Sequence, residues 1–406
     1  MPLQYFGVNP HPDVLTTLGW PFTGVSPMPF GSLRLWATKT TWYDLNPAKG
    51  SYDWTPLDNW LNAAVQNGVT DILYTFGSVP AWASCDPEDQ TCVIRVTPAG
   101  SCDPPTDLNP DGSGSDEIWQ TFVQAIAQHA VGRIRYWEVW NEPDLQTSWN
   151  GTQAQMARMA KDAYNVIKSV DSNALVTTPA TVNGGGKHDI AHWLPGYFAA
   201  GGDTRADIVS FHGYVDPAQG QAAEYVSTVV STVFSGLPQA LSSKPIWDTE
   251  ASWGPNSHLS DPDLQAAFVA RMYLLQWSEG VQRFYWFQYG DQGNGTLCIS
   301  GGVGCALNQV GDAYVQVSKW IVGATMASTC AASGPVWSCG FTAPGGIQKL
   351  AVWDASQTCG GGSCTTSTYM PNSIYVSYAD LAGVTTTISP GSPVQVGAKP
   401  ILFLNQ

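Results

Sequence analysis

Two glutamates, Glu142 and Glu250, each come directly after a short apolar and aromatic run of the kind that forms a buried β-strand. Pro143 follows Glu142, and because proline cannot continue a strand ladder, we expect this glutamate at the end of its strand. Turn-forming residues after Glu250 place it in the same way. Two carboxyl groups at strand ends could share acid–base work, one donating a proton while the other attacks or positions water.

This division of labour is the requirement for hydrolysis of a glycosidic bond. One carboxyl protonates the leaving oxygen, and the other attacks the anomeric carbon or positions water there. A loop carboxylate that caps the next turn would explain one such glutamate, but it does not explain two in the same setting. The paired carboxyls therefore predict chemistry on glycosides.

The elements that must position the glutamates alternate between strand and helix, the pattern of a parallel sheet with crossover helices. The predicted strands are 5–9, 33–36, 71–76, 134–140, 174–179, 208–212, 245–249 and 283–287. The predicted helices are 56–67, 118–130, 153–170, 262–278 and about 312–322, with Thr55, Ser115 and Ser260 before the first, second and fourth. Alternation of eight strands with helices predicts an α/β fold, a (β/α)8 TIM barrel over residues 1–323, with catalytic groups at the carboxyl ends of its strands.

The sequence pattern changes after the last predicted helix. Short strands separated by Gly, Pro and Ser fall at 349–353, 373–378, 384–388, 394–396 and 401–404. This spacing predicts a small C-terminal antiparallel β-sandwich over residues 324–406. Its closeness to the last barrel helix favours a packed structural appendage over an independent sugar-binding module.

Period-two alternation along a strand predicts which residues share the barrel interior. Glu138 shares a face with Glu142, and Asp248 shares a face with Glu250. A buried carboxylate needs a partner, and Arg34 on the second strand and His212 on the sixth are the expected ones. Glu138 and Asp248 are interpreted as supporting groups rather than reacting groups.

The glutamate motifs resemble those of the clan A retaining glycoside hydrolases. The residues that carry this resemblance are Trp140-Asn141-Glu142-Pro143 and Thr249-Glu250. Within the clan, the chain is most similar to family 39 through Arg34-Leu35-Trp36, Trp42, Leu45-Asn46-Pro47, Tyr52-Asp53-Trp54 and Val79-Pro80-Ala81-Trp82. The resemblance covers roughly the first three hundred residues.

This resemblance implies roles for individual residues. Glu142 would be the acid/base and Glu250 the nucleophile, while Arg34 and Asn141 would contact the nucleophile or a substrate hydroxyl. Tyr214 would donate a hydrogen bond to the nucleophile. The substrate-binding residues expected on this basis, including aromatic rings that stack on a sugar, are Arg34, Trp36, Asn141, His212, Tyr214, Trp253 and Trp286, with Trp286 as the platform beneath the sugar at the scissile bond. Trp82 and Trp149 also follow strands and are candidates for lining the same cleft.

Composition restricts the partners. A net charge of −15 and a pI near 4.5 argue against nucleic acid and anionic membranes, so a neutral oligosaccharide or polysaccharide is the expected partner. Charged residues make up only 12% of the chain, and its 18 tryptophans are more than is usual for a globular protein. Both features fit a secreted protein with aromatic surfaces. The double-displacement chemistry predicts no cofactor and no metal. Few basic residues lie near the strand ends, which argues against a uronic acid substrate.

Nine cysteines fall largely in close pairs that suit disulfides and extracellular exposure. The expected pairs are Cys298 with Cys305, Cys330 with Cys339, and Cys359 with Cys364. Two of Cys85, Cys92 and Cys102 should bond to each other, and the sequence leaves the choice open. A stapled loop over 83–114 and another over 291–311 would wall the catalytic face and favour exo action.

The leading hypothesis is therefore a secreted retaining glycosidase that acts on neutral plant-type glycans, releasing xylosyl or arabinosyl units by double displacement. An endo-acting glycanase or a transglycosylase would share every catalytic residue. A carbohydrate-binding barrel without activity would be expected to have lost one of the two glutamates or Asn141, and neither loss has occurred. The oligomeric state stays open.

Overall fold

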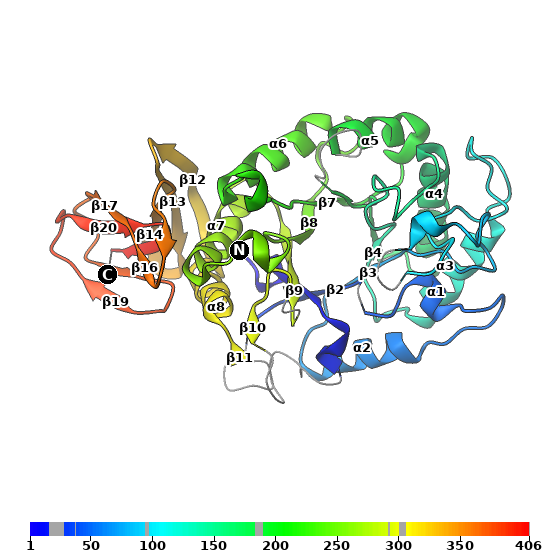
Figure 1. Cartoon of the computed structure of the whole chain (residues 1–406), viewed down its shortest axis with the longest axis horizontal. Helices are drawn as coiled ribbons and strands as arrows, with labels where there is room; N and C mark the ends of the chain where they lie inside the picture. Colours follow the sequence, from blue (N-terminus) through cyan, green and yellow to red (C-terminus); the bar gives the residue numbers. More distant parts are fainter. Residues whose placement is uncertain are drawn as a thin grey trace.

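The computed structural model describes residues 1–15, 28–36, 38–93, 97–182, 190–290, 293–299 and 306–405. Within these residues, nine strands form one curled parallel sheet in the order β5-β4-β3-β2-β1-β9-β8-β7-β6 (Figure 1). The strands are β1 Phe6–Pro10, β2 Ser32–Leu35, β3 Ile72–Thr75, β4 Tyr136–Glu138, β5 Leu175–Thr177, β6 Thr181–Val182, β7 Val209–His212, β8 Ile246–Ala251 and β9 Arg283–Tyr289. The predicted barrel is confirmed.

The fifth strand of the barrel is interrupted and forms two pieces, β5 and β6. β5 pairs with β4 on one side, and β6 pairs with β7 on the other. A parallel bridge from Thr177 to Ile208 completes the circle. The predicted strand 174–179 therefore ends early, because residues 178–180 separate β5 from β6.

Helices surround the sheet. They are α1 Trp42–Leu45, α2 Thr55–Gln66, α3 Glu117–His129, α4 Gln153–Val170, α5 Ile190–Tyr197, α6 Val226–Gly236, α7 Pro262–Ser278 and α8 Gln309–Ile321. α4 begins with a reciprocal capping box between Thr152 and Gln155. The N-cap of α7 is Asp261 rather than the expected Ser260, and its carboxylate accepts from two backbone N–H groups.

Three of these helices, α1, α5 and α6, were not predicted. α6 has the sequence VSTVVSTVFSG, which is rich in β-branched residues that disfavour helices by intrinsic propensity. Packing overrides that propensity, because Val226, Val229, Val230 and Val233 recur at helical spacing and are all buried. In the part of the chain that the structure describes, no helix is both long and apolar enough to cross a membrane.

The C-terminal part is antiparallel, as predicted. One sheet has the order β12-β13-β14-β21-β18-β19, with β12 Thr325–Ser333, β13 Val336–Ala343, β14 Ile347–Asp354, β18 Ser377–Ala379, β19 Thr385–Thr387 and β21 Ile401–Leu404. β17 Thr366–Tyr369 pairs with β20 Val394–Gly397, and the short pairs are β10 Cys298–Ile299 with β11 Ala306–Leu307, and β15 Cys359–Gly360 with β16 Ser363–Cys364. The prediction missed β12 and β13; most residues of β12 are small or polar, so its sequence lacks the apolar alternation of a strand. The predicted strand 373–378 is wrong in its first part, because residues 373–376 are not strand.

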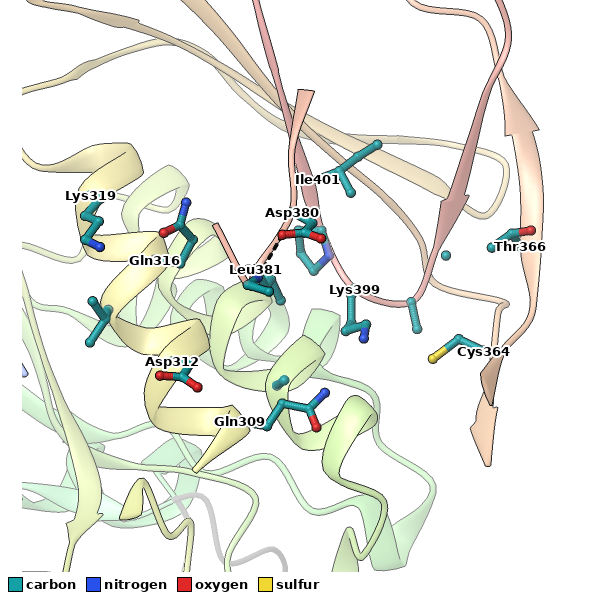
Figure 2. A pocket seen from close by; sticks show the side chains of 16 residues that line it. Gln309, Asp312, Gln316, Lys319, Cys364, Thr366, Asp380, Leu381, Lys399 and Ile401 are labelled. Atoms are coloured by element: carbon teal, nitrogen blue, oxygen red, sulfur yellow. Dashed lines mark hydrogen bonds between the residues drawn. The ribbon is translucent and has the colours of Figure 1, made fainter. Parts of the chain in front are cut away.

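The C-terminal sheets lie beside α7 and α8 (Figure 1). A buried polar cluster joins the two parts of the protein. Arg271 of α7 donates to the carbonyl of Ala398 at 2.9 Å and contacts Glu224 at 3.2 Å, and Glu224 also accepts from the indole of Trp353 at 2.6 Å. Next to this junction lies a groove between α8 and the C-terminal strands, lined by polar side chains such as Lys319, Asp312 and Asp380 (Figure 2).

Three disulfides are present among the described residues: Cys92–Cys102, Cys330–Cys339 and Cys359–Cys364. The choice that the sequence left open is settled, because Cys85 is the free cysteine. Cys298 is disulfide-bonded, and its predicted partner Cys305 lies outside the described residues.

Candidate active site

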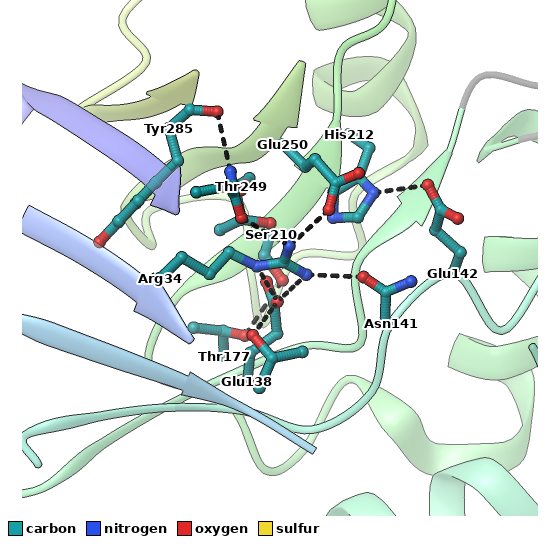
Figure 3. Close-up of polar contacts among 12 residues, drawn as sticks. Arg34, Glu138, Asn141, Glu142, Thr177, Ser210, His212, Thr249, Glu250 and Tyr285 are labelled. Atoms are coloured by element: carbon teal, nitrogen blue, oxygen red, sulfur yellow. Dashed lines mark hydrogen bonds and ion pairs between the residues drawn. The ribbon is translucent and has the colours of Figure 1, made fainter. Parts of the chain in front are cut away.

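Arg34 is the centre of the polar network inside the barrel. It stands on β2, is completely buried, and contacts four side chains (Figure 3). Its guanidinium donates to Glu138 at 2.8 Å, Glu250 at 2.6 Å, Asn141 at 2.8 Å and Asn9 at 3.1 Å. Burial alone would lower the pKa of Arg34, but the charges of Glu138 and Glu250 outweigh this effect and raise it. The buried cation therefore links β1, β2, β4 and β8.

Glu250, on β8, is held by donors on both carboxyl oxygens. Arg34 contacts Oε2 at 2.6 Å, and the hydroxyl of Tyr214 donates to Oε1 at 2.9 Å. Burial and the charge of Glu250 raise the pKa of Tyr214 well above its usual range, so this phenol keeps the proton with which it bonds the carboxylate. A carboxylate fixed by a cation and a phenol is oriented for attack on an electrophilic carbon.

Glu142 stands four residues beyond the end of β4 and adopts a left-handed backbone conformation with φ of 47°. Such a conformation is uncommon for a non-glycine residue and is maintained here by neighbouring contacts. The backbone N–H of Glu142 donates to the carbonyl of Ala180 at 2.7 Å, and one carboxyl oxygen lies 2.8 Å from Nδ1 of His212. Burial would lower the pKa of His212, but the charges of Glu250 and Glu142 raise it overall. The ring of His212 orients the Glu142 carboxyl through this contact.

The two glutamates face each other across a short gap. An oxygen of Glu142, an oxygen of Glu250 and a ring nitrogen of His212 all lie within 4.8 Å of one another. Figure 3 shows both glutamates beside the ring of His212, with Glu142 joined to it by a dashed line. A gap of this size matches the separation of about 5–5.5 Å in retaining glycosidases rather than the 6.5–9.5 Å that inverting enzymes need to admit water.

Glu138 lies in the barrel beneath Glu142, as the period-two pattern predicts, but the same prediction is wrong for Asp248. Asp248 pairs in register with Phe284, whose ring packs on Tyr273 of α7, so its side chain faces α7 and not the interior. Glu138 pairs with Arg34 and accepts a hydrogen bond from Thr75 at 2.9 Å. Asp248 does not bond His212. It accepts from Gln276 of α7 at 2.7 Å and from the backbone N–H of Gly213 at 3.0 Å, because its side chain points toward that helix.

Two tryptophans that were expected to stack on a sugar, Trp286 and Trp253, are buried and cannot do so. Trp286 is completely buried, packs against Trp253 at 5.4 Å between ring centroids, and donates its indole N–H to the carbonyl of Gly295 at 2.6 Å. Trp253 is only 1% exposed and packs on Phe268 of α7. Trp286 points outward from the barrel toward α7, because alternation along β9 directs Tyr285 to the interior instead. Trp253 follows β8 and packs in the same outer layer.

The aromatic ring that β9 brings to the catalytic end is Phe287, which sequence analysis missed. It is partly exposed, and its ring lies 6.4 Å from that of Tyr214 in an edge-on arrangement. Counting in twos from Tyr285 would have found it. Trp36 is partly exposed at the end of β2, and its ring lies against Gly77, where a Cβ would collide with it at 2.3 Å. Trp149 is buried against Trp140 and does not line the cleft.

Two clusters of metal-ligand type occur among the described residues. Asp89, Cys92, Cys102 and Asp103 form one, but its sulfurs are bonded to each other and offer no thiolate. Glu142, His212 and Glu250 form the other, where Arg34 and Tyr214 already occupy the oxygens of Glu250. Neither donor set suits a resident metal.

Paired glutamates at this spacing, on the strand ends of such a barrel, are the machinery of a glycoside hydrolase. Residues 112–314, which make up half of the chain, match the family described as the glycosyl hydrolase catalytic core. The chain belongs to this family.

Individual relatives point to one type within this class. The chain is 27% identical over 268 residues to a β-xylosidase of Geobacillus stearothermophilus, a match that covers 60% of the chain but 49% of that enzyme. The chain thus spans about half the length of this relative. Among solved structures, a family 39 glycoside hydrolase from Bacteroides cellulosilyticus has a TM-score of 0.70 at 19% identity, covering 99% of this chain and 81% of that one. A family 39 β-xylosidase from Caulobacter crescentus has a TM-score of 0.64 at 17% identity, covering 99% and 96%. The fold of the chain is therefore similar to that of the family 39 glycoside hydrolases, which its motifs resemble.

Asp248 should make the stability of the protein depend on pH. Burial raises its pKa to about 7, although hydrogen bonds from Gly213 and Gln276 act in the opposite direction. Since this folded pKa lies above the ordinary 3.8, the stability that the carboxyl contributes is complete below about pH 4 and is lost as the pH rises to about 7. Relative to Asp248→Asn, which cannot titrate, the wild type should lose on the order of 4 kcal/mol across this window.

Urea unfolding at several pH values would measure this difference, with Asp312→Asn, an exposed residue of α8, as the control. A stability gap between wild type and Asp248→Asn that does not change with pH would contradict the prediction.

Proposed function

We propose that this protein is a secreted, retaining, exo-acting glycosidase that releases neutral pentosyl units, xylosyl or arabinosyl, from plant-type glycans. The observation that carries the proposal is a difference in how the two facing glutamates are hydrogen-bonded. Arg34 and Tyr214 fix both oxygens of Glu250, whereas Glu142 is held at one oxygen by His212. Glu250 is therefore assigned as the nucleophile and Glu142 as the group that moves protons.

The reaction follows from these positions. Glu250 attacks the anomeric carbon while Glu142 gives its proton to the leaving oxygen, so the glycosidic bond breaks as an ester to Glu250 forms. Glu142 then takes a proton from water, and that water displaces Glu250 from the same face that the leaving group occupied. Two inversions give net retention. Arg34 and Tyr214 also stabilise the carboxylate that is released at the end.

The charges around the glutamates favour a neutral sugar. Among the described residues, Arg34 and His212 are the basic side chains that contact the two glutamates, and both are occupied by them. A uronic acid would need a further cation for its carboxylate. The β-xylosidases among the relatives also support a pentosyl substrate.

The loop after β3 supports exo action. It runs over residues 83–114, and the Cys92–Cys102 disulfide staples it. The carbonyl of Cys102 accepts from the backbone N–H of Asn150 at 2.8 Å, which ties this loop to the segment that follows Glu142. A fixed wall of this kind favours a closed pocket over an open groove. Disulfides and a net charge of −15 fit an extracellular protein.

A panel of aryl β-xylosides, α-L-arabinosides, hexosides and uronides tests the substrate class. We expect the highest kcat/KM on a neutral pentoside and release of monosaccharide from the non-reducing end of pentosyl oligomers. A preference for uronides, or release of internal fragments before monosaccharide, would contradict the proposal.

The two glutamates should fail in different ways when replaced. Glu250→Ala should lose turnover on every substrate, by about 10⁴-fold or more, because no nucleophile remains. Glu142→Ala should still form the glycosyl-enzyme from substrates with good leaving groups, accumulate it, and regain turnover with azide, giving a glycosyl azide of retained configuration.

Steady-state and burst kinetics on aryl glycosides, followed by product analysis, would separate these behaviours. Glu88→Ala, an exposed carboxylate of the 83–114 loop, is the control and should behave like the wild type. Any azide product formed by Glu250→Ala should have inverted configuration, because azide then attacks in place of the missing nucleophile. A retained azide product from Glu250→Ala together with an inverted one from Glu142→Ala would exchange the two roles.

A further inference from the structure

A second crevice lies outside the barrel, apart from the catalytic network. It has a volume of about 150 Å³ and lies between α3, the segment after α1, and Trp82, which follows β3. Tyr52 and Trp82 form its aromatic walls, and Lys49 and Glu117 stand at its edge. Trp82 was a candidate for lining the catalytic cleft, but the structure places it here instead.

The Tyr52 ring is rigidly mounted. It stacks on Trp54 with 5.0 Å between centroids and 7° between planes, and Trp54 stacks on His129 of α3 at 4.7 Å and 14°. His129 is fixed in turn by Asp58 at 3.0 Å. Because Trp54 covers one face of Tyr52, the part of the ring that lines the crevice is the opposite face or the edge.

The Trp82 ring is also fixed. Its indole N–H donates to the carbonyl of Asn46 at 2.8 Å, and the side-chain amide of Asn46 donates to the carbonyls of Ala48 and Ser51 at 2.9 and 2.8 Å. Both rings remain partly exposed. Two immobilised and partly exposed rings can bind a ligand without the entropic cost of ordering their side chains.

Hydrogen-bonding groups surround this aromatic lining. The Lys49 ammonium and the Glu117 carboxylate are exposed, and neither has a side-chain partner among the described residues. The hydroxyl of Tyr52 likewise has no hydrogen-bond partner in the described part of the chain. One donor-only cation and one acceptor-only anion leave the edge of the crevice with no net charge.

We propose that this crevice is a non-catalytic carbohydrate-binding site that takes a single sugar unit of a neutral glycan chain. The axial C–H groups of a pyranose give it an apolar face that packs on aromatic rings, and its hydroxyls can donate to Glu117 and accept from Lys49. The larger groove beside α8 offers no such surface, because none of the side chains that line it is aromatic (Figure 2). The identity of the glycan rests on the proposed function, since the bound chain would be the polymer that the enzyme trims.

Affinity electrophoresis in gels containing soluble arabinoxylan would test the site, with all variants made in a Glu250→Ala background so that the polymer is not consumed. Tyr52→Ala should weaken retardation about tenfold, which corresponds to the loss of about 1.4 kcal/mol of stacking. The double variant Lys49→Ala/Glu117→Ala, which alters only exposed side chains, should weaken it in the same direction. The control is Tyr225→Ala, which removes a ring that is 39% exposed at the start of α6, away from the crevice. It should leave the retardation unchanged.

Hydrolysis of aryl pentosides by the same variants with Glu250 restored reports on the catalytic site separately. We expect it to be unchanged for Tyr52→Ala, while KM for the polymer rises. Undiminished polymer binding by both the Tyr52→Ala and the double variant would overturn the crevice proposal and leave the proposed function intact. Inactivity of the parent enzyme on every pentoside would instead refute the proposed function, and binding of a neutral glycan could then still be measured in the gels.

Discussion

The buried guanidinium of Arg34 is the constraint on which the catalytic end of the barrel depends. A cation without solvent needs carboxylates, and here it has two, Glu138 at 2.7 Å and Glu250 at 2.6 Å. These carboxylates come from different strands, so the electrostatic requirement fixes the relative positions of β2, β4 and β8. Removing one member of such a group leaves a buried charge uncompensated, which typically costs about 3–5 kcal/mol.

The same network makes the two glutamates unequal. Glu250 belongs to the buried charge cluster, while Glu142 lies beyond it, in a left-handed turn, with 16% of its side chain exposed. His212 stands between them and contacts only Glu142 directly. A residue that must exchange protons with a leaving group and then with water needs that greater access to solvent, and a nucleophile needs a fixed direction of attack.

Sequence reasoning located the strands and the two glutamates because both depend on local pattern: apolar runs that end at Pro143 or at turn residues. It also placed Glu138 in the interior correctly, since alternation is a property of the strand itself. It misplaced Asp248, because the register shift between Asp248 and Ala251 interrupts the alternation along β8, so Glu250 reaches Arg34 while Asp248 faces α7. It misassigned Trp286 because the aromatic residues of β9 occupy consecutive positions, so composition did not show which face each ring takes. The partner of Asp248 could not be foreseen, since Gln276 comes from α7 and the packing of that helix on β8 brings the two side chains together. Trp82 was placed in the catalytic cleft because it follows a strand, but the fold of the segment after α1 decides where that ring lies.

The most direct test of this account is the configuration of the first product formed by the wild-type enzyme. Proton NMR of an aryl pentoside reaction, recorded before mutarotation, would distinguish the two anomers. If Glu250 attacks the anomeric carbon directly, the first sugar released has the configuration of the substrate. An inverted first product would show that water attacks instead, and would contradict the assignment of Glu250 as nucleophile.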